Sequence, residues 1–203
     1  MNIGDSLSLL EQTIPGLSDV IKRHTVSSMD EFVEQLYVDL ENAIQTAENN
    51  KQQFKGNFSE DYITTLLLAH LTALNYDATH DTQIGGHCDI FIKHRLKGFQ
   101  WIGEAKIWKG CQYIMGGWQQ LCNIYSRGTQ RDNHGGILIY INQRNANKLF
   151  VDWKDHMESS DKIDDLNIEI DSKNPLRFNS THTHLASGLP YNVRHFALVM
   201  YHA

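Results

Sequence analysis

The chain has 203 residues and carries a formal net charge of −6 at pH 7. This length suits one substantial core and does not favour a second independent domain. The negative balance argues against a protein that coats nucleic acid through bulk positive charge. It does not exclude a nuclease, because carboxylates that gather metal ions add to the negative count.

We expect a cytoplasmic protein that does not enter a membrane. No apolar run approaches the length that spans a bilayer, and residues 1–5 lack the basic-then-apolar order of a signal peptide. The three cysteines, Cys88, Cys111 and Cys122, have no CxxC spacing. This usage is typical of free thiols in a reducing compartment.

The amino-terminal part of the chain predicts helical structure. The residues before 28 are weakly patterned and indicate a short helix or an arm. Ser28 and Glu31 have the spacing of a capping box at the start of a helix, and the polar residues 48–53 indicate a linker after it. The apolar positions of this helix recur at helical spacing: Phe32, Leu36, Leu40 and Ile44.

A second helix is predicted over residues 59–75. Glu60 precedes its apolar stripe by three residues, so this carboxylate should face the core at the head of the stripe, whereas Asp61 faces elsewhere. The stripe consists of Ile63, Leu67, Leu71 and Leu74.

A hairpin with charged residues in its strands follows. A strand over residues 79–84 and a glycine pair precede two apolar runs; the first contains Asp89, the second contains Glu104 and Lys106, and Gly98 marks the turn between them. Because strand side chains alternate between faces, Glu104 and Lys106 point to the same side of the sheet. Charged residues are seldom buried unless they are paired or bind a metal, so these three need an explanation.

The whole pattern predicts an α/β fold with a mixed central β-sheet flanked by helices on both faces. Residues 1–57 are expected to form an N-terminal helical extension, for dimerisation or substrate contact, to a domain over residues 58–203. The two parts should make one compact unit. The remaining predicted elements are a helix over 113–126, a strand over 137–141, a helix over 145–159, and strands over 166–170 and 193–202.

The order of these elements, with an acid on the helix, an Asp on one strand and Glu-x-Lys on the next, resembles the PD-(D/E)xK nuclease superfamily. Restriction endonucleases and Holliday-junction resolvases belong to this superfamily. The resemblance covers residues 59–142 and implies a restriction endonuclease-like core. Cys88 stands where the name-giving motif has proline, a position that varies widely in such enzymes.

The resemblance implies roles for individual residues. Asp89 would be the motif aspartate, Glu104 the variable acid and Lys106 the lysine, so these three are the candidate catalytic residues. Glu60 would be the helix carboxylate found in many members. The implied activity is that of a Mg²⁺-dependent endonuclease, with Mn²⁺ able to substitute, that acts on DNA rather than RNA in bacterial restriction, anti-phage defence or repair. A homodimer would suit double-strand cutting, and a regulatory or defence-system protein is a further expected partner.

The residue types fit this chemistry on physical grounds. Mg²⁺ prefers hard oxygen ligands and usually binds one or two protein carboxylates. Asp89, Glu104 and the backbone carbonyl of Ala105 are the candidate ligands, and Glu60 could join through water or at a second ion. Metal binding lowers the pKa of water to a useful range. Lys106 could orient that water or stabilise charge on the phosphate.

Further residues are candidates for substrate binding. His87 lies two residues before Asp89 and shares its face on a regular strand, and Lys109 and Arg127 belong to a basic set around the site. Some family members carry a Gln-x-x-x-Tyr helix after the lysine strand. Gln119 and Gln120 are the candidates for that glutamine and Tyr125 for the tyrosine, but the spacing from Gln120 to Tyr125 is one residue longer here, so no role is transferred from this submotif.

Structural interpretations stay open beside the functional ones. Asp89, Glu104 and Lys106 could form a solvated face with a cross-strand ion pair, and Glu60 could simply favour the helix dipole. We favour the functional interpretation of the hairpin because the neighbouring isoleucines indicate strands packed on both sides. Gln120 is more often a surface residue than a functional one.

The histidines near the carboxyl end offer another candidate metal site, but no cysteine or acid cluster with zinc spacing accompanies them. We therefore expect polar side chains at a strand edge or on the surface, with a DNA contact by His184 or His195 still open. The histidines concerned are His182, His184, His195 and His202.

Two other classes of function are open. One is a catalytically silent nucleic-acid-binding or protein-interaction module of the same fold, which predicts no metal-dependent strand scission. The other is a partner protein, such as an immunity or toxin-associated factor, whose hairpin charges are only structural. It predicts that Glu104→Ala leaves every activity intact.

Overall fold

The computed structural model describes residues 3–56, 58–83 and 85–202. It contains a mixed seven-stranded sheet in the order β1-β4-β5-β6-β9-β8-β7. The pairs β5–β6 and β6–β9 are parallel, and the remaining pairs are antiparallel. The strands of this sheet are β1 Asp77–Thr79, β4 Ile90–Lys93, β5 Gln100–Ile107, β6 His134–Ile141, β7 Asn167–Ile170, β8 Arg177–Thr183 and β9 Pro190–Val199.

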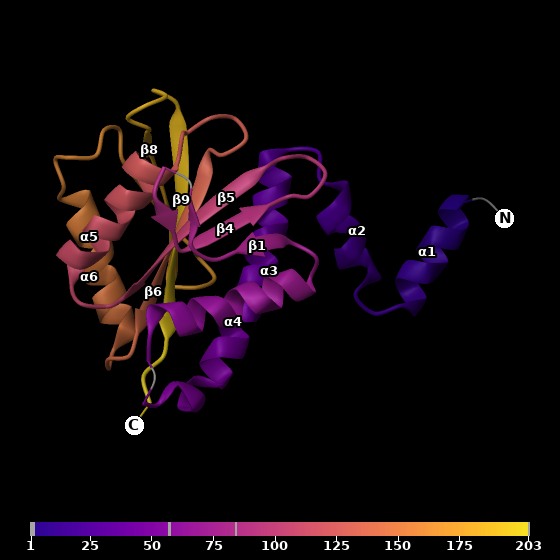
Figure 1. Cartoon of the computed structure of the whole chain (residues 1–203), viewed down its shortest axis with the longest axis horizontal. Coiled ribbons are helices and arrows are strands. Elements are labelled where there is room, and N and C mark those ends of the chain that lie inside the picture. Colours follow the sequence, from indigo (N-terminus) through magenta and orange to yellow (C-terminus); the bar gives the residue numbers. More distant parts are fainter. Residues whose placement is uncertain (1–2, 57, 84, 203) are drawn as a thin grey trace.

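Helices cover both faces of the sheet (Figure 1). On one face α3 and α4 pack on β4, β5, β6 and β9, and on the other face α5, a π-helical turn and α6 complete a second core cluster. The predicted α/β fold with helices on both faces is therefore confirmed. The helices are α1 Ile3–Thr13, α2 Leu17–Thr25, α3 Met29–Asn49, α4 Glu60–Ala73, α5 Cys111–Gln120 and α6 Ala146–Glu158, with a 3₁₀ turn at Lys51–Phe54 and the π turn at Leu121–Tyr125. No helix of the described residues is long and apolar enough to cross a membrane.

The start of α3 follows the capping pattern of the sequence. The Ser28 hydroxyl accepts a hydrogen bond from the Glu31 N–H at 3.1 Å. The Glu31 carboxylate reaches one residue further back than a standard capping box, to the Ser27 N–H at 2.7 Å. At its other end α3 runs to Asn49, so residues 48–53 are mostly helical rather than a linker.

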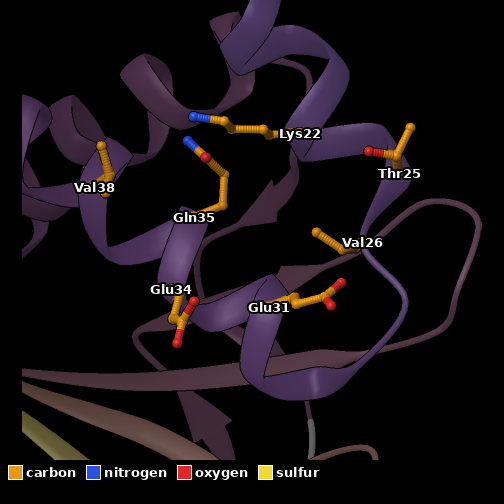
Figure 2. A pocket seen from close by; sticks show the side chains of 7 residues that line it. All are labelled: Lys22, Thr25, Val26, Glu31, Glu34, Gln35 and Val38. Carbon is orange, nitrogen blue, oxygen red and sulfur yellow. The ribbon is translucent and has the colours of Figure 1, made fainter.

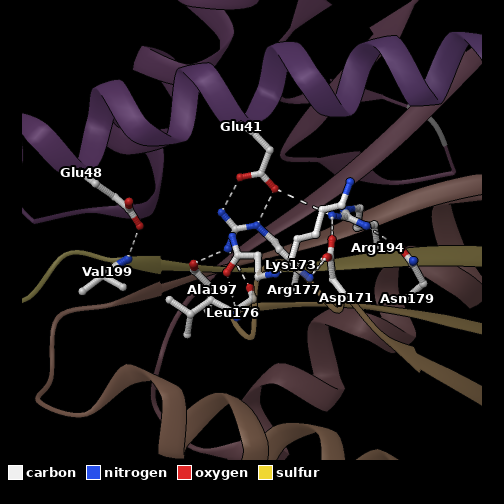
Figure 3. Close-up of polar contacts among 11 residues, drawn as sticks. Glu41, Glu48, Asp171, Lys173, Leu176, Arg177, Asn179, Arg194, Ala197 and Val199 are labelled. Carbon is white, nitrogen blue, oxygen red and sulfur yellow. Dashed lines mark hydrogen bonds and ion pairs between the residues drawn. The ribbon is translucent and has the colours of Figure 1, made fainter.

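Polar contacts join α3 to strands β8 and β9 of the sheet (Figure 3). Glu41 pairs with Arg177 of β8 through two short contacts of 2.7 and 2.8 Å, and it lies 4.0 Å from Arg194 of β9. Two turns further along, Glu48 accepts a hydrogen bond from the Val199 N–H at 2.7 Å. Because charged hydrogen bonds of this kind are strong when shielded from water, α3 is held in register on the sheet. It is part of the same packed core as α4.

The amino-terminal helices α1 and α2 extend away from the body (Figure 1). The prediction of a short helix or arm here is thus met by two short helices. Between α2 and α3 lies a hollow of about 380 Å³ that side chains of both helices surround (Figure 2). It includes none of the candidate site residues; its lining consists of Lys22, Thr25, Val26, Glu31, Glu34, Gln35 and Val38.

Two strand predictions need correction. The run expected to be one strand through Asp89 is divided into β3 (His87–Cys88), which pairs with β2 (Thr82–Gln83), and β4. The strand expected over 79–84 is likewise divided between β1 and β2, and residue 84 lies outside the described residues. Strand β8 was not predicted, because its inward positions are Phe178, Ser180 and His182, of which only one is apolar.

The prediction of edge or surface histidines is wrong for three of the four. His195, His184 and His182 are all buried. His195 and His184 are accommodated because their ring nitrogens find partners: His195 contacts Ser180 Oγ at 2.9 Å, and His184 contacts Ser126 Oγ at 3.0 Å. Among the described residues, Nδ1 of His182 has no hydrogen-bond partner. Burial lowers the pKa of His182 to about 4, so this side chain is neutral at physiological pH.

Candidate functional site

Three predicted catalytic side chains converge at the carboxyl end of β5. The Lys106 ammonium lies 2.5 Å from Glu104 Oε1 and 3.9 Å from Asp89 Oδ2. The two carboxylates are therefore separated by no more than the sum of these distances. Asp89 comes from the junction of β3 and β4, and the other two side chains come from β5. The arrangement places two acids and one base on the α5 side of the sheet.

The geometry follows from a difference in strand length. Strand β4 pairs with β5 only from Gln100 to Gly103, so the edge of β5 beyond Gly103 has no strand partner on that side. Side-chain carboxylates occupy this edge instead. Asp89 Oδ2 accepts a hydrogen bond from the Ala105 N–H at 2.9 Å, and Glu60 Oε1 accepts one from the Ile107 N–H at 2.8 Å.

The same edge of β5 also carries a backbone carbonyl oxygen. In a strand, the N–H and C=O of one residue point to the same side. The Ala105 carbonyl therefore lies on the edge where Asp89 is bound. Glu60 follows at the next outward-pointing residue, about 7 Å further along the strand. Tyr113 of α5 donates a hydrogen bond to Glu60 at 3.3 Å, which connects the helix to this row of acids.

Burial and mutual repulsion make the acid pair hard to ionise. Burial raises the pKa of Glu104 to about 7, the charge of Asp89 adds to the effect, and Lys106 offsets only part of it. Burial also raises the pKa of Asp89. Burial alone would lower the pKa of Lys106, but its hydrogen bond to Glu104 and the charges of Asp89 and Glu60 outweigh that effect and raise it. The site holds excess negative charge that a cation would relieve.

One oxygen of the pair has an unmet bonding capacity. Glu104 Oε2 is buried and has no hydrogen-bond partner among the described residues. A buried carboxylate oxygen without a donor is costly unless something binds it. In the part of the chain that the structure describes, no group of three or more His, Cys, Asp or Glu side chains could hold a metal ion. The groups that could hold Mg²⁺ at this place are two carboxylates and one backbone carbonyl, a set of oxygen donors within the range that Mg²⁺ uses.

Helix α5 approaches the acid–lysine group through a glycine. A Cβ atom on Gly117 would lie 3.0 Å from Lys106 Cε and Cγ and 3.3 Å from Glu104 Cγ. These distances are tighter than ordinary van der Waals contact. The absence of a side chain at Gly117 therefore leaves the space that the two β5 side chains occupy. On the adjacent residue, Gly116, a Cβ would meet nothing within 4 Å.

These two glycines give a matched pair for mutation. Gly116→Ala should stabilise the protein by about 0.5–1 kcal/mol, because alanine has the higher helix propensity and the space is open. Gly117→Ala should gain less or lose stability, and it should displace Lys106. Urea unfolding of both variants measures the difference. Equal stabilisation of the two would contradict the close packing of Gly117 on β5.

A π turn follows α5 and carries Tyr125. The Ser126 N–H bonds to the Leu121 carbonyl, five residues back. Burial raises the pKa of Tyr125 to about 12, and the charges of Glu104 and Asp89 contribute. Tyr125 therefore lies near the acid pair. A Cβ on Gly86 would come within 2.7 Å of the Tyr125 ring, so the glycine directly before β3 allows this close approach.

The remaining predicted residues lie around the site at different distances from its centre. Lys109 lies over the Tyr113 ring at 4.6 Å, next to Glu60. Gln120 is half-buried on α5, one turn after the glycine that faces the acids. His87 turns to Asp81 at 2.8 Å and is 67% exposed, because the break at Asp89 ends the strand alternation on which its prediction depended.

Arg127 is not brought to the acid pair. Its guanidinium binds Asp132 at 2.8 Å and the Gln100 side chain at 3.0 Å. This places it near the beginning of β5, whereas Glu104 lies toward the end of the strand.

Sequence analysis gave no role to three residues that the structure brings to the site: Tyr113, Gly117 and Tyr125. The glycine pair inside a predicted helix was the available signal, because glycine destabilises a helix interior and so needs a packing reason. The Tyr113 contact with Glu60 crosses more than fifty residues of chain and left no local pattern.

Comparison of this chain with protein-family models, with curated proteins and with solved structures finds no match.

Proposed function

We propose that this protein is a metal-dependent nuclease that hydrolyses phosphodiester bonds of DNA. The observation that carries the proposal is the convergence of Asp89, Glu104 and Lys106, together with the buried Glu104 oxygen that has no hydrogen-bond partner among the described residues. Two acids with raised pKa values beside a lysine suit cation binding better than they suit a stable ion-pair network.

The topology supports a restriction endonuclease-like core. The antiparallel hairpin β4–β5 carries the acids, and β5 is parallel to the central strand β6. The π turn supports the submotif resemblance as well. Hydrogen bonds to the fifth residue, rather than the fourth, take up one extra residue. Gln120 and Tyr125 therefore keep the relation that a four-residue spacing gives in an α-helix.

Mg²⁺, or Mn²⁺ in its place, would bind Asp89, Glu104 and the Ala105 carbonyl, with Glu60 nearby. Bound there, the ion supplies Lewis-acid polarisation of the phosphate and lowers the pKa of water. Lys106 is positioned to donate hydrogen bonds to phosphate oxygens and to stabilise the charge that develops on them. Tyr113 and Gly117 orient Glu60 and Lys106, respectively.

The proposal is tested with purified protein on plasmid, linear and single-stranded DNA and on RNA, with Mg²⁺, Mn²⁺ or a chelator. We expect metal-dependent scission that Asp89→Asn reduces by about 1000-fold or more, since several kcal/mol of transition-state stabilisation are lost. Circular dichroism and the oligomeric state should be unchanged in the variant. Full activity of a folded Asp89→Asn protein would rule out the assignment.

A second candidate is a catalytically silent binding module of the same fold. It is favoured by the observation that Asp89 and Glu60 already cap two strand-edge N–H groups and so have a structural role. It predicts that the wild-type protein binds nucleic acid without cutting it under every metal condition. A homodimer, a defence-system partner and a bacterial restriction, defence or repair setting remain part of the proposal and not of the observed structure.

A further inference from the structure

Two adjoining hollows lie near Gln100, the first residue of β5. The first, of about 460 Å³, is lined by Tyr125, Phe91 and Arg127 among others. The second, of about 450 Å³, is lined by Arg127, Thr129 and Arg131 among others. Gln100 and Arg127 line both hollows, so the two lie side by side. We call them together the arginine groove.

The arginine groove is basic in an acidic chain. Among the described residues, its lining includes two arginines and no Asp or Glu, although the chain carries a net charge of −6. Arg127 is 62% exposed, so its guanidinium remains open to a ligand while one edge is paired. Arg131 is exposed as well. A local positive track of this kind attracts a polyanion that the rest of the surface repels.

Hydrogen bonds fix the loop that carries the two arginines of the groove. Asp132 is only 2% exposed, and its carboxylate binds Arg127 on one side and the Thr129 N–H and hydroxyl on the other. The Arg131 carbonyl accepts a hydrogen bond from the Gln100 N–H at 2.9 Å, which fixes the loop to β5. Both arginines therefore project from a backbone that is held in place.

The first hollow of the groove lies close to the acid pair along both strands of the hairpin. Phe91, which lines this hollow, follows Asp89 by two residues and pairs with Ile102, which precedes Glu104 by two residues. Gln100 lies four residues before Glu104 on β5, a distance of about 13 Å along a strand. A length of about 13 Å corresponds to about four phosphates of one B-form strand measured along its axis.

We infer that the arginine groove binds the phosphate backbone of the nucleic-acid strand being cut, on one side of the scissile bond, with Arg127 and Arg131 as the phosphate contacts. The inference rests on the proposed nuclease function and adds the path of the substrate. Phosphate contacts fix the register of a strand without reading its sequence. The two arginines therefore position the substrate and do not determine base specificity.

The test measures binding of a fluorescent oligonucleotide, single-stranded and duplex, to the full chain in chelator as a function of salt. Each lost phosphate contact should reduce the slope of log K against log salt by about 0.7–0.9. We expect this reduction for Arg131→Ala and for Arg127→Ala, and about twice as much for the double variant. Lys148→Ala is the matched control, since Lys148 is also surface-exposed (65%) and paired with a carboxylate.

Each outcome separates the groove from the catalytic proposal. Slopes that stay at the wild-type value in Arg131→Ala and in the double variant would overturn the inference, even if the wild-type protein cuts DNA. Reduced slopes in the arginine variants, together with a wild-type protein that never cuts, would support phosphate binding in the groove and reject the nuclease proposal. Arg131→Ala keeps the test valid if Arg127→Ala disturbs Asp132. Equal competition by polyglutamate would also overturn the assignment, because it would indicate a general polyanion surface.

Discussion

Glu104→Gln is expected to abolish cleavage and, at the same time, to stabilise the metal-free protein above pH 7. The folded-state pKa of Glu104 is raised from 4.5 to about 7 by burial and by Asp89. A raised carboxyl pKa means that the folded protein holds a proton which the unfolded chain releases. Stability therefore falls as the pH rises from about 4.5 to about 7. Glutamine is neutral at every pH and avoids this loss.

The pKa shift of Glu104 sets the largest gain in unfolding free energy that the Glu104→Gln variant can show. At pH 8 in chelator, the variant should exceed the wild type by up to about 3 kcal/mol in unfolding free energy, and the difference should vanish near pH 4.5. Urea titrations at several pH values measure it. Adding Mg²⁺ at about 1,000 times its Kd should reverse the order, because ligand at that concentration stabilises the binding protein by about 4.1 kcal/mol. Only the wild type should respond.

A wild-type protein that shows no stabilisation by Mg²⁺ or Mn²⁺ would count against the metal site, whatever its activity. A Glu104→Gln variant that is less stable than the wild type at pH 8 would show instead that the pair with Lys106 outweighs the burial cost. That result would favour the silent-module candidate, in which these charges are structural.

Lys106→Met should reduce turnover by about 10²–10³-fold, the usual loss when one donor to a developing negative charge is removed. Methionine keeps the length of the side chain beside Gly117. Since Lys106 lowers the pKa of Glu104, its loss should raise that pKa further and shift the rise of cleavage rate to higher pH. At pH 8, the metal affinity should change much less than the turnover.

Lys154→Met of α6 is the matched control for this experiment. Lys154 is 16% exposed and paired with two carboxylates, whereas Lys106 is 13% exposed and lies within 4 Å of two. Loss of turnover in both variants would indicate a general effect of removing a shielded ion pair. Full turnover of Lys106→Met with weakened metal binding would reassign Lys106 to holding the acids in place.

Local patterns predicted those elements whose apolar residues have one clear period. The helix α3 begins at its Ser28 cap, α4 begins after Ser59 with Glu60 at its head, and the hairpin β4–β5 turns near Gly98. Local patterns failed to predict elements whose buried positions are polar, as in β8, or a strand that is interrupted, as at Asp89. His195 was misassigned for a related reason, since the partners that allow its burial, Ser180 and Trp153, lie on β8 and α6.

By itself the sequence determined that Glu104 and Lys106 share a face, because strand alternation is a property of one local segment. It also determined that charged residues interrupt a buried hairpin. Only the tertiary structure decided that Asp89 caps the Ala105 N–H, that Glu60 lies next along the same edge, and that Gly117 makes room for Lys106. Those contacts join segments far apart in the chain. They depend on β4 ending before β5 does, a difference in strand length that no local pattern records.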